Sequence, residues 1–187
     1  MSTTEATDYT LDDFTSEVGT LVTSGLNEHP LTEQVATRLR KLLAGGLDLP
    51  PELVAPRADK YVMRPLYVAP DGSFSVAAAV WGVGQGTPVH GHETWGVVGI
   101  HSGIELETRY SKPEGDGKPL VAAGQESWGP GEVTVCCTTD DDVHTVSCGG
   151  DTPCVGIHVY GADIGTLQRR SYNPATGDVS WFVSRWG

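Results

Sequence analysis

Two histidines separated by one residue, His90 and His92, have the spacing in this sequence that most directly suggests chemistry. They lie in GQGTPVHGHETWGVVGIHSG, residues 84–103, an apolar run of β character that follows glycine and proline turn signals. Residues i and i+2 of a strand point to the same face, so the two imidazoles would project side by side and could share one metal ion. The pair alone is as compatible with a structural role as with metal binding.

A third histidine, His144, begins another β-like run far downstream. Three imidazoles with no fourth protein ligand would leave positions on a metal open for a substrate and for oxygen. Imidazole binds Fe, Zn, Ni and Cu, so the ligand type does not select the metal. The cysteines contain no CxxC spacing, and we expect free thiols rather than a second metal site. They are Cys136, Cys137, Cys148 and Cys154.

The spacing of the histidines resembles the two sequence motifs of the cupin superfamily. Gly84, five residues, His90-x-His92 and then Gly103 are similar to the first motif. His144 falls where the second motif has its histidine. The resemblance implies that these three histidines bind one metal ion in a cupin barrel.

Within the cupins, the sequence is similar to the cysteine dioxygenase family and its bacterial thiol dioxygenases. The usual cupin carboxylate would fall at about Gly96 or Val97 and is missing, which leaves the three-histidine pattern of that family. Thr94 and Trp95 continue the histidine pair as in the bacterial members. The resemblance extends from about residue 62 to residue 170 and implies an Fe(2+) cofactor.

The activity implied by the resemblance is the oxidation of a small thiol by O2 to its sulfinic acid. A neutral ligand set suits such a substrate, because a cation that keeps its charge favours loss of the thiol proton. The substrate would be cysteine, 3-mercaptopropionate or a bulkier thiol. Two alternatives remain open at this point: a cupin enzyme with another metal or reaction, and a non-catalytic cupin that binds a small ligand.

The stretch Pro-Cys-Val-Gly-Ile-His-Val-Tyr, residues 153–160, is predicted to place Gly156, His158 and Tyr160 on one strand face. The family has Ser-His-Tyr here, in which the tyrosine hydroxyl reaches the metal-bound ligands and the histidine orients it. His158 and Tyr160 match this catalytic pair, and Gly156 does not. Without the resemblance, both would be read as ordinary barrel residues. Residues 94–97 lack the cysteine that crosslinks to the tyrosine in some members, so we expect Tyr160 to be unmodified.

A thiol substrate with a carboxylate needs a cationic partner, and arginine supplies a bidentate one. Arg64 aligns with the carboxylate-binding arginine of the cysteine-specific members, and Arg169 resembles that of mercaptopropionate-type enzymes. Trp81 matches an aromatic pocket wall, and Trp95 would either close the pocket or pack in the core. We expect the other candidates to be structural or exposed: His29, His101 and Arg170.

Apolar residues at helical spacing predict two helices, over residues 8–26 and 31–45, that cover one face of the following structure. We expect a single cupin domain over 1–187, with a helical N-terminal part in 1–46 and the β-barrel in 60–187.

Short β-like runs separated by turn signals indicate a sandwich or barrel. The resemblance narrows this to an all-β core, the cupin double-stranded β-helix barrel, with an N-terminal helical cap. The expected strands are 61–69, 73–82, 94–101, 104–110, 118–124, 132–138, 143–147, 153–160 and 179–183.

The formal net charge of −12, from 12 basic and 24 acidic residues, argues against nucleic acid as a partner. The sequence contains no apolar run long enough for a transmembrane helix, and its first residues are acidic and polar, unlike a signal peptide. We therefore expect a cytoplasmic protein with no membrane partner. The resemblance implies a monomer whose partners are a small-molecule thiol and O2.

Overall fold

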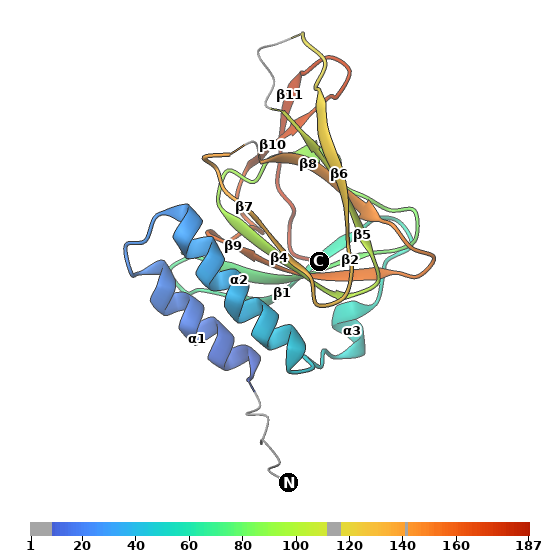
Figure 1. Cartoon of the computed structure of the whole chain (residues 1–187). Coiled ribbons are helices and arrows are strands. Elements are labelled where there is room, and N and C mark those ends of the chain that lie inside the picture. The colour runs from blue at the N-terminus through green and yellow to red at the C-terminus, as the bar shows by residue number, and fades with distance from the viewer. Residues whose placement is uncertain (1–8, 112–116, 141) are drawn as a thin grey trace.

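The computed structural model describes residues 9–111, 117–140 and 142–187. Three helices come first, α1 (Leu11–Val22), α2 (Glu28–Ala44) and α3 (Pro51–Val54). The strands follow (Figure 1): β1 (Val62–Val68), β2 (Ser75–Trp81), β3 (Val89–His90), β4 (Gly96–Ser102), β5 (Glu105–Tyr110), β6 (Ala122–Trp128), β7 (Val133–Cys136), β8 (Val143–Cys148), β9 (Cys154–Tyr160), β10 (Arg169–Tyr172) and β11 (Val179–Phe182).

The strands form two antiparallel sheets. The first has the order β1-β2-β9-β4-β7, and the second has the order β11-β10-β3-β8-β5-β6. Strands far apart in sequence are therefore neighbours, as β9 lies between β2 and β4, and β3 lies between β10 and β8. The register places His90 directly opposite His144.

Helices α1 and α2 lie side by side against the outer face of the first sheet (Figure 1). Thr10 caps α1 through a reciprocal pair of hydrogen bonds with Asp13. The helices bury an apolar core against the sheet, and α2 approaches β4 closely at Gly99, where a Cβ would lie 2.8 Å from Leu39 Cδ2. Among the described residues, no helix is long and apolar enough to cross a membrane.

The inner faces of the two sheets form a second core between them. Trp81 of β2 and Tyr160 of β9 pack in one buried cluster with Val146 of β8. The lining of β2 and β9 includes the small residues Ala79 and Gly156. The candidate functional residues gather in this inner space.

Both predicted helices are present, with shifted ends. α1 is shorter than 8–26, and its first predicted residue lies outside the described part of the chain. α2 begins at Glu28, before Pro30, although the prediction began after the proline. Proline is tolerated there because amide groups in the first helical turn have no intrahelical partner.

The all-β core with N-terminal helices is confirmed, but three strands differ from the prediction. β3 and β10 were not expected, because β3 has only two residues and β10 begins with two arginines, so neither shows an alternating apolar pattern. β6 spans Ala122–Trp128 rather than 118–124. Its residues are mostly exposed, so burial imposes no apolar pattern from which its ends could be read.

Candidate metal centre

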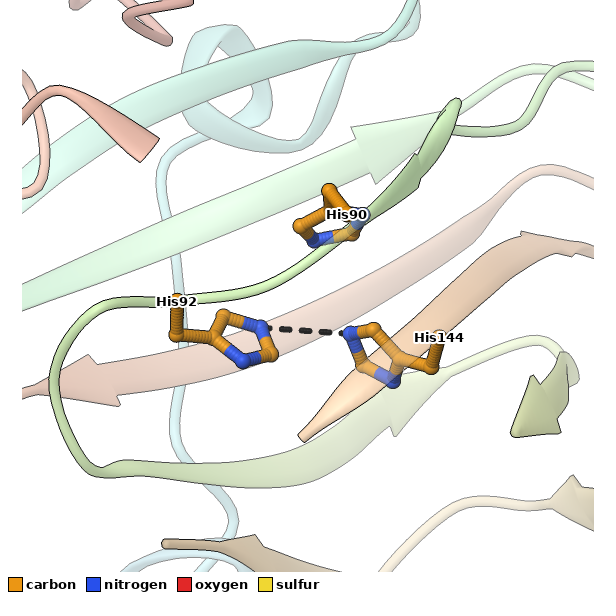
Figure 2. A group of neighbouring side chains, drawn as sticks. All are labelled: His90, His92 and His144. Carbon is orange, nitrogen blue, oxygen red and sulfur yellow. Dashed lines mark hydrogen bonds between the residues drawn. The ribbon is translucent and has the colours of Figure 1, made fainter. Parts of the chain in front are cut away.

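The three predicted ligands meet in the inner space between the sheets (Figure 2). Ligand nitrogens of His90, His92 and His144 all lie within 4.8 Å of one another, and His92 Nε2 is 3.2 Å from His144 Nε2. The side chains come from β3, from the loop after it and from β8. Their residues are only 1–7% exposed. The structure therefore confirms that the three histidines form one group with the geometry to bind a metal.

The chain turns immediately after the histidine pair, at Glu93, and not between His90 and His92. β3 ends at His90, and Glu93 adopts a left-handed backbone conformation with φ of 58°. The Glu93 carboxylate accepts two hydrogen bonds from Arg170, at 2.6 and 2.9 Å. The backbone N–H of His92 donates to Asp142 Oδ2 at 3.1 Å. The two imidazoles converge as predicted, although β3 ends at His90 and does not include His92.

Hydrogen bonds to the rear nitrogens orient two of the three rings. His90 Nδ1 lies 3.0 Å from the carbonyl oxygen of Pro88, which can only accept, so Nδ1 carries the hydrogen. His144 Nδ1 lies 2.6 Å from Glu107 Oε1. In both rings Nε2 is then left for a metal. Carboxylate or carbonyl partners of this kind commonly fix the tautomer of metal-binding histidines.

Glu107 was not identified from the sequence. It also accepts hydrogen bonds from Trp128 Nε1 at 3.0 Å and from Arg109 at 3.1 Å. Burial alone would raise the pKa of Glu107, but the hydrogen bonds and charges of His144 and Arg109 outweigh it and lower the pKa to about 2. The carboxylate is thus ionised behind His144. The one signal in the sequence was the alternation of two glutamates, Glu105 and Glu107, in an otherwise β-like run.

The electrostatics of the cluster favour neutral imidazoles. Burial lowers the pKa of His90 and His92 well below the usual value, and repulsion from the other histidines and Arg169 adds to this effect. Neutral rings present lone pairs, which is the form that binds a metal. The donor set therefore fits a divalent transition metal, and imidazole alone leaves its identity open.

The cluster has no carboxylate ligand, and the packing at Gly96 explains why. Gly96 pairs with both Cys136 and Tyr160 on the neighbouring strands. A Cβ at Gly96 would lie 2.7 Å from Cys136 Sγ and 3.3 Å from Tyr160 Cδ1. A glutamate at this position would not fit, so the described structure holds three histidine donors at this centre.

Most of the other predicted site residues line a narrow cavity next to the cluster. His158 and Tyr160 project inward from β9, and His158 Nδ1 lies 2.8 Å from the Tyr160 hydroxyl. The Trp81 ring lies against His158 with 5.5 Å between centroids. The cavity is lined by the three histidines of the cluster, His158, Tyr160, Trp81, Arg169, Tyr61, Met63, Ala79, Thr87 and Val146.

Arg169 is the cation that reaches this cavity. It begins β10 and is only 2% exposed. Its guanidinium donates to Ser184 Oγ at 2.6 Å and lies 4.7 Å from the centroid of the Phe182 ring. Arg169 Nε and Trp81 Nε1 are buried and have no hydrogen-bond partner in the described structure. Two residues that line the cavity therefore each have an N–H donor without a partner.

Arg64 and Trp95 are not brought to the cavity. Arg64 lies on the outer face of β1, because its neighbour Met63 points inward, and it donates to the carbonyl oxygen of Leu53 at 3.2 Å. Trp95 packs in the core between the first sheet and the helices. The expectation that Arg64 contacts the substrate is therefore corrected, and Trp95 follows the packing alternative.

A second group of ligand-type residues lies near the start of α2. His29, Cys137 and Asp140 place one candidate atom each within 4.8 Å of one another. His29 Nδ1 lies 3.8 Å from Cys137 Sγ, and His29 Nε2 lies 3.3 Å from Asp140 Oδ1. The four cysteines are free thiols, as expected.

No family model matches the chain. Solved structures with a similar fold include an uncharacterized protein with a double-stranded β-helix domain from Klebsiella pneumoniae, at 15% identity and a TM-score of 0.44. That match covers 75% of this chain and 97% of the other.

Two further solved structures are similar to this chain. The protein TT1209 from Thermus thermophilus is 16% identical, with a TM-score of 0.48 over 62% of this chain and 96% of the other. A cupin superfamily protein from Desulfitobacterium hafniense is 12% identical, with a TM-score of 0.46 over 63% of this chain and 93% of the other. Similarity at this level concerns the fold alone, so the chemistry must be argued from the site.

Proposed function

We propose that this protein is an iron-dependent thiol dioxygenase that oxidises a small thiol carrying a carboxylate to its sulfinic acid. The observation that carries the proposal is one cavity that joins three histidine donors, a buried tyrosine–histidine pair and a buried arginine. In this reaction both atoms of one O2 molecule are added to the thiol sulfur. The sulfur is oxidised and O2 is reduced, so no further reductant is required.

His90, His92 and His144 would hold the iron. When bound, Fe(II) would supply the redox chemistry that joins sulfur and oxygen, and three protein ligands leave room for both reactants. Because all three donors are neutral, the charge of the ion is not compensated by the protein. A site of this kind favours an anionic thiolate, which supports a thiol substrate.

Arg169 would bind the substrate carboxylate. One of its terminal nitrogens donates to Ser184, whereas Nε has no partner in the described structure. A buried N–H without an acceptor is costly, and a carboxylate in the cavity would satisfy it with a charge-assisted bond. The carboxylate would then hold the thiol end toward the histidine cluster.

Tyr160 would act as a neutral hydrogen-bonding group beside the reacting atoms. Burial raises the pKa of Tyr160 well above the usual value, so the phenol stays protonated near neutral pH. Its hydroxyl is held 2.8 Å from His158 Nδ1, and its ring centroid lies 5.6 Å from that of His92. The hydroxyl is thereby fixed in orientation next to the metal ligands.

The proposal is tested by oxygen uptake of the Fe(II)-loaded protein with 3-mercaptopropionate, cysteine and cysteamine, followed by mass spectrometry of the product. We expect a carboxylate-bearing thiol to gain two oxygen atoms. Bound iron without oxygen uptake for any thiol would overturn the proposal. Stoichiometric nickel or zinc in the isolated protein, again without uptake, would favour another cupin reaction.

Arg169→Ala tests the substrate class. We expect the KM for the carboxylate-bearing thiol to rise about 10- to 100-fold, as for loss of a charge-assisted hydrogen bond, with little change for cysteamine, which has no carboxylate. Arg64→Ala is the matched control because Arg64 lies on the outer face of β1. An equal rise in KM for both kinds of thiol would exclude a carboxylate-binding role for Arg169.

A further inference from the structure

Strand β5 buries a second carboxylate beside the cavity. Glu105 lies two residues before Glu107, so both side chains leave β5 on the same face. Glu105 is only 2% exposed, and its Oε1 has no hydrogen-bond partner among the described residues. A buried carboxylate oxygen without a donor is costly, so its position calls for a partner.

The group that faces Glu105 is the imidazole of His158. His158 Nε2 lies 3.8 Å from Glu105 Oε1, and it too is buried without a partner in the described part of the chain. The two groups meet above Gly156. A Cβ at Gly156 would clash with Glu105 Oε1 and would lie 2.6 Å from His158 Nε2. The absence of a side chain at Gly156 is therefore what allows the carboxylate to reach the histidine.

We propose that Glu105 is a positioning residue that fixes His158 as the Nε2–H tautomer, so that Nδ1 accepts the hydrogen bond of the Tyr160 hydroxyl. The role of Tyr160 in catalysis rests on the proposed function, whereas the Glu105–His158–Tyr160 arrangement does not. In sequence this unit is hidden, because Glu105 comes from β5 in the second sheet and the other two residues come from β9 in the first.

The tautomer follows from the chemistry of the facing atoms. An ionised carboxylate only accepts hydrogen bonds, and a bare Nε2 lone pair would repel it in a buried environment. Nε2 therefore carries the hydrogen, and Nδ1 is left as an acceptor. The Tyr160 hydroxyl, 2.8 Å from Nδ1, is then the donor. The remaining lone pairs of the hydroxyl oxygen are free to accept from a donor in the cavity, such as the S–H of a thiol.

The 3.8 Å between Glu105 Oε1 and His158 Nε2 is longer than a hydrogen bond, and a small movement of either side chain would close the difference. Hydrogen bonds at active sites are often long without substrate and shorten to about 2.6–3.2 Å in the complex. Glu105 Oε1 and His158 Nε2 have no other hydrogen-bond partner within the described structure, so neither would have to break a hydrogen bond to approach the other. Glu105 and Glu107 then serve different histidines from one strand: Glu107 orients a metal ligand, and Glu105 orients the partner of Tyr160.

The experiment is long-range 1H–15N NMR of the histidine rings in the metal-free protein, with Tm measured for each variant. In the wild type we expect the Nε2–H pattern for His158, which His158→Gln assigns by removing the signal. Glu105→Ala should lose that pattern. Glu105→Gln should retain it, because the amide oxygen still accepts from Nε2–H. Glu107→Ala, two residues along the same strand, should leave the His158 pattern unchanged.

Kinetics supply the second measurement. Glu105→Ala is expected to lower kcat about 10- to 100-fold, in the range of lost orienting partners, while KM and iron affinity stay within about twofold. An Nδ1–H pattern in the wild type, or an unchanged pattern in Glu105→Ala, would overturn the proposal. If the wild type oxidises no thiol, the proposed function fails, but the NMR result still decides the role of Glu105.

Discussion

Two groups of ligand-type side chains in this molecule have similar separations between their atoms but different surroundings. His90, His92 and His144 are almost completely buried between the sheets. In the second group, the side chains of His29 and Asp140 are 60% and 56% exposed. Proximity alone would rate the two groups equally, because each fits within 4.8 Å. The two groups differ in the protonation state that burial favours for their potential ligands.

Burial has opposite effects in the two groups. In the first, it lowers the pKa of His90 and His92 and so produces the neutral, metal-binding form of imidazole. In the second, burial raises the pKa of Cys137 and keeps its thiol protonated, although a thiolate is the form that binds metals. The same physical effect therefore creates a donor set in one place and removes a donor in the other.

Orientation separates the groups further. Glu107 and the Pro88 carbonyl hold the rear nitrogens of His144 and His90, which directs their other nitrogens to one point. In the second group, both nitrogens of His29 are engaged by different neighbours, Cys137 on one side and Asp140 on the other. We conclude that the His90, His92 and His144 group is preorganised for a metal and that the second group is a surface network.

The largest expected effect is the loss of the metal in His92→Ala. Removing one of three donors leaves two, which is too few to hold a divalent ion in an open site. We expect iron content and thiol oxidation to fall together to background, measured by metal analysis and oxygen uptake on the same sample. His29→Ala is the matched control in the second group and should keep the wild-type iron content.

Two outcomes would contradict the distinction between the two groups. Turnover that survives in His92→Ala would place the reaction elsewhere in the molecule. A halved metal content in His29→Ala would show that the second group also binds an ion, which its exposed and separately engaged ligands argue against.

A smaller effect is expected for Glu107→Ala. The carboxylate orients His144 through the 2.6 Å contact at Nδ1, and loss of such a partner typically weakens metal binding by about 10- to 100-fold. The measurement is a competition titration of Fe(II) against a chelator. Glu107→Gln should recover part of the affinity, because its amide oxygen still accepts from Nδ1–H. Wild-type affinity in Glu107→Ala would mean that packing alone orients His144.

The buried histidines also predict how the metal-free protein responds to pH. Their pKa is lowered in the folded state and lies near 6.5 in the unfolded chain, so below this pH the unfolded state binds more protons. The free energy of unfolding is therefore highest above the unfolded pKa and decreases as the pH falls below it. Each group adds at most about 1.4 kcal/mol per pH unit.

Urea unfolding between pH 7.5 and pH 5.5 measures this slope. His90→Gln removes one buried imidazole and should reduce the slope of the unfolding free energy against pH by up to about 1.4 kcal/mol per pH unit. A slope that is equal in the wild type and His90→Gln would show that the cluster does not stay neutral in the folded state.

The sequence was sufficient to predict the helices, the all-β core and the grouping of the three histidines. Each of these leaves a local signal: apolar spacing for the helices, turn residues between short strands, and histidines next to β-like runs. The convergence of the histidines was predicted correctly. His92 lies between the two-residue strand β3 and the turn at Glu93, and its backbone N–H is held by Asp142, a contact that no strand pattern reveals.

The remainder of the site depends on which strands become neighbours. Arg64 and Arg169 were equivalent in the sequence, but Met63 faces inward and so turns Arg64 outward, whereas β10 carries Arg169 to the cavity. Glu105 and Glu107 reach their histidines because β5 pairs with β8 and faces β9 across the inner space. Such contacts between sheets follow from topology and register, which a single sequence does not encode locally.

The smallest expected effect concerns the ion pair at Glu93, in the turn that directly follows His92. Arg170 holds the Glu93 carboxylate with two hydrogen bonds, but the Arg170 side chain is 45% exposed, and solvent screens such pairs. We expect Arg170→Ala to lower the free energy of unfolding by less than about 1 kcal/mol, measured by urea unfolding.

Metal affinity in the same variant shows whether this exposed pair is needed to place His92. His92 is also held by its backbone bond to Asp142 and by nearly complete burial, so we expect the affinity of Arg170→Ala to stay within about threefold of the wild type. Glu93→Gly should be tolerated as well, since glycine adopts the left-handed conformation without strain. A large loss of affinity in either variant would mean that the buried cluster depends on surface contacts, and it would narrow the difference between the two groups.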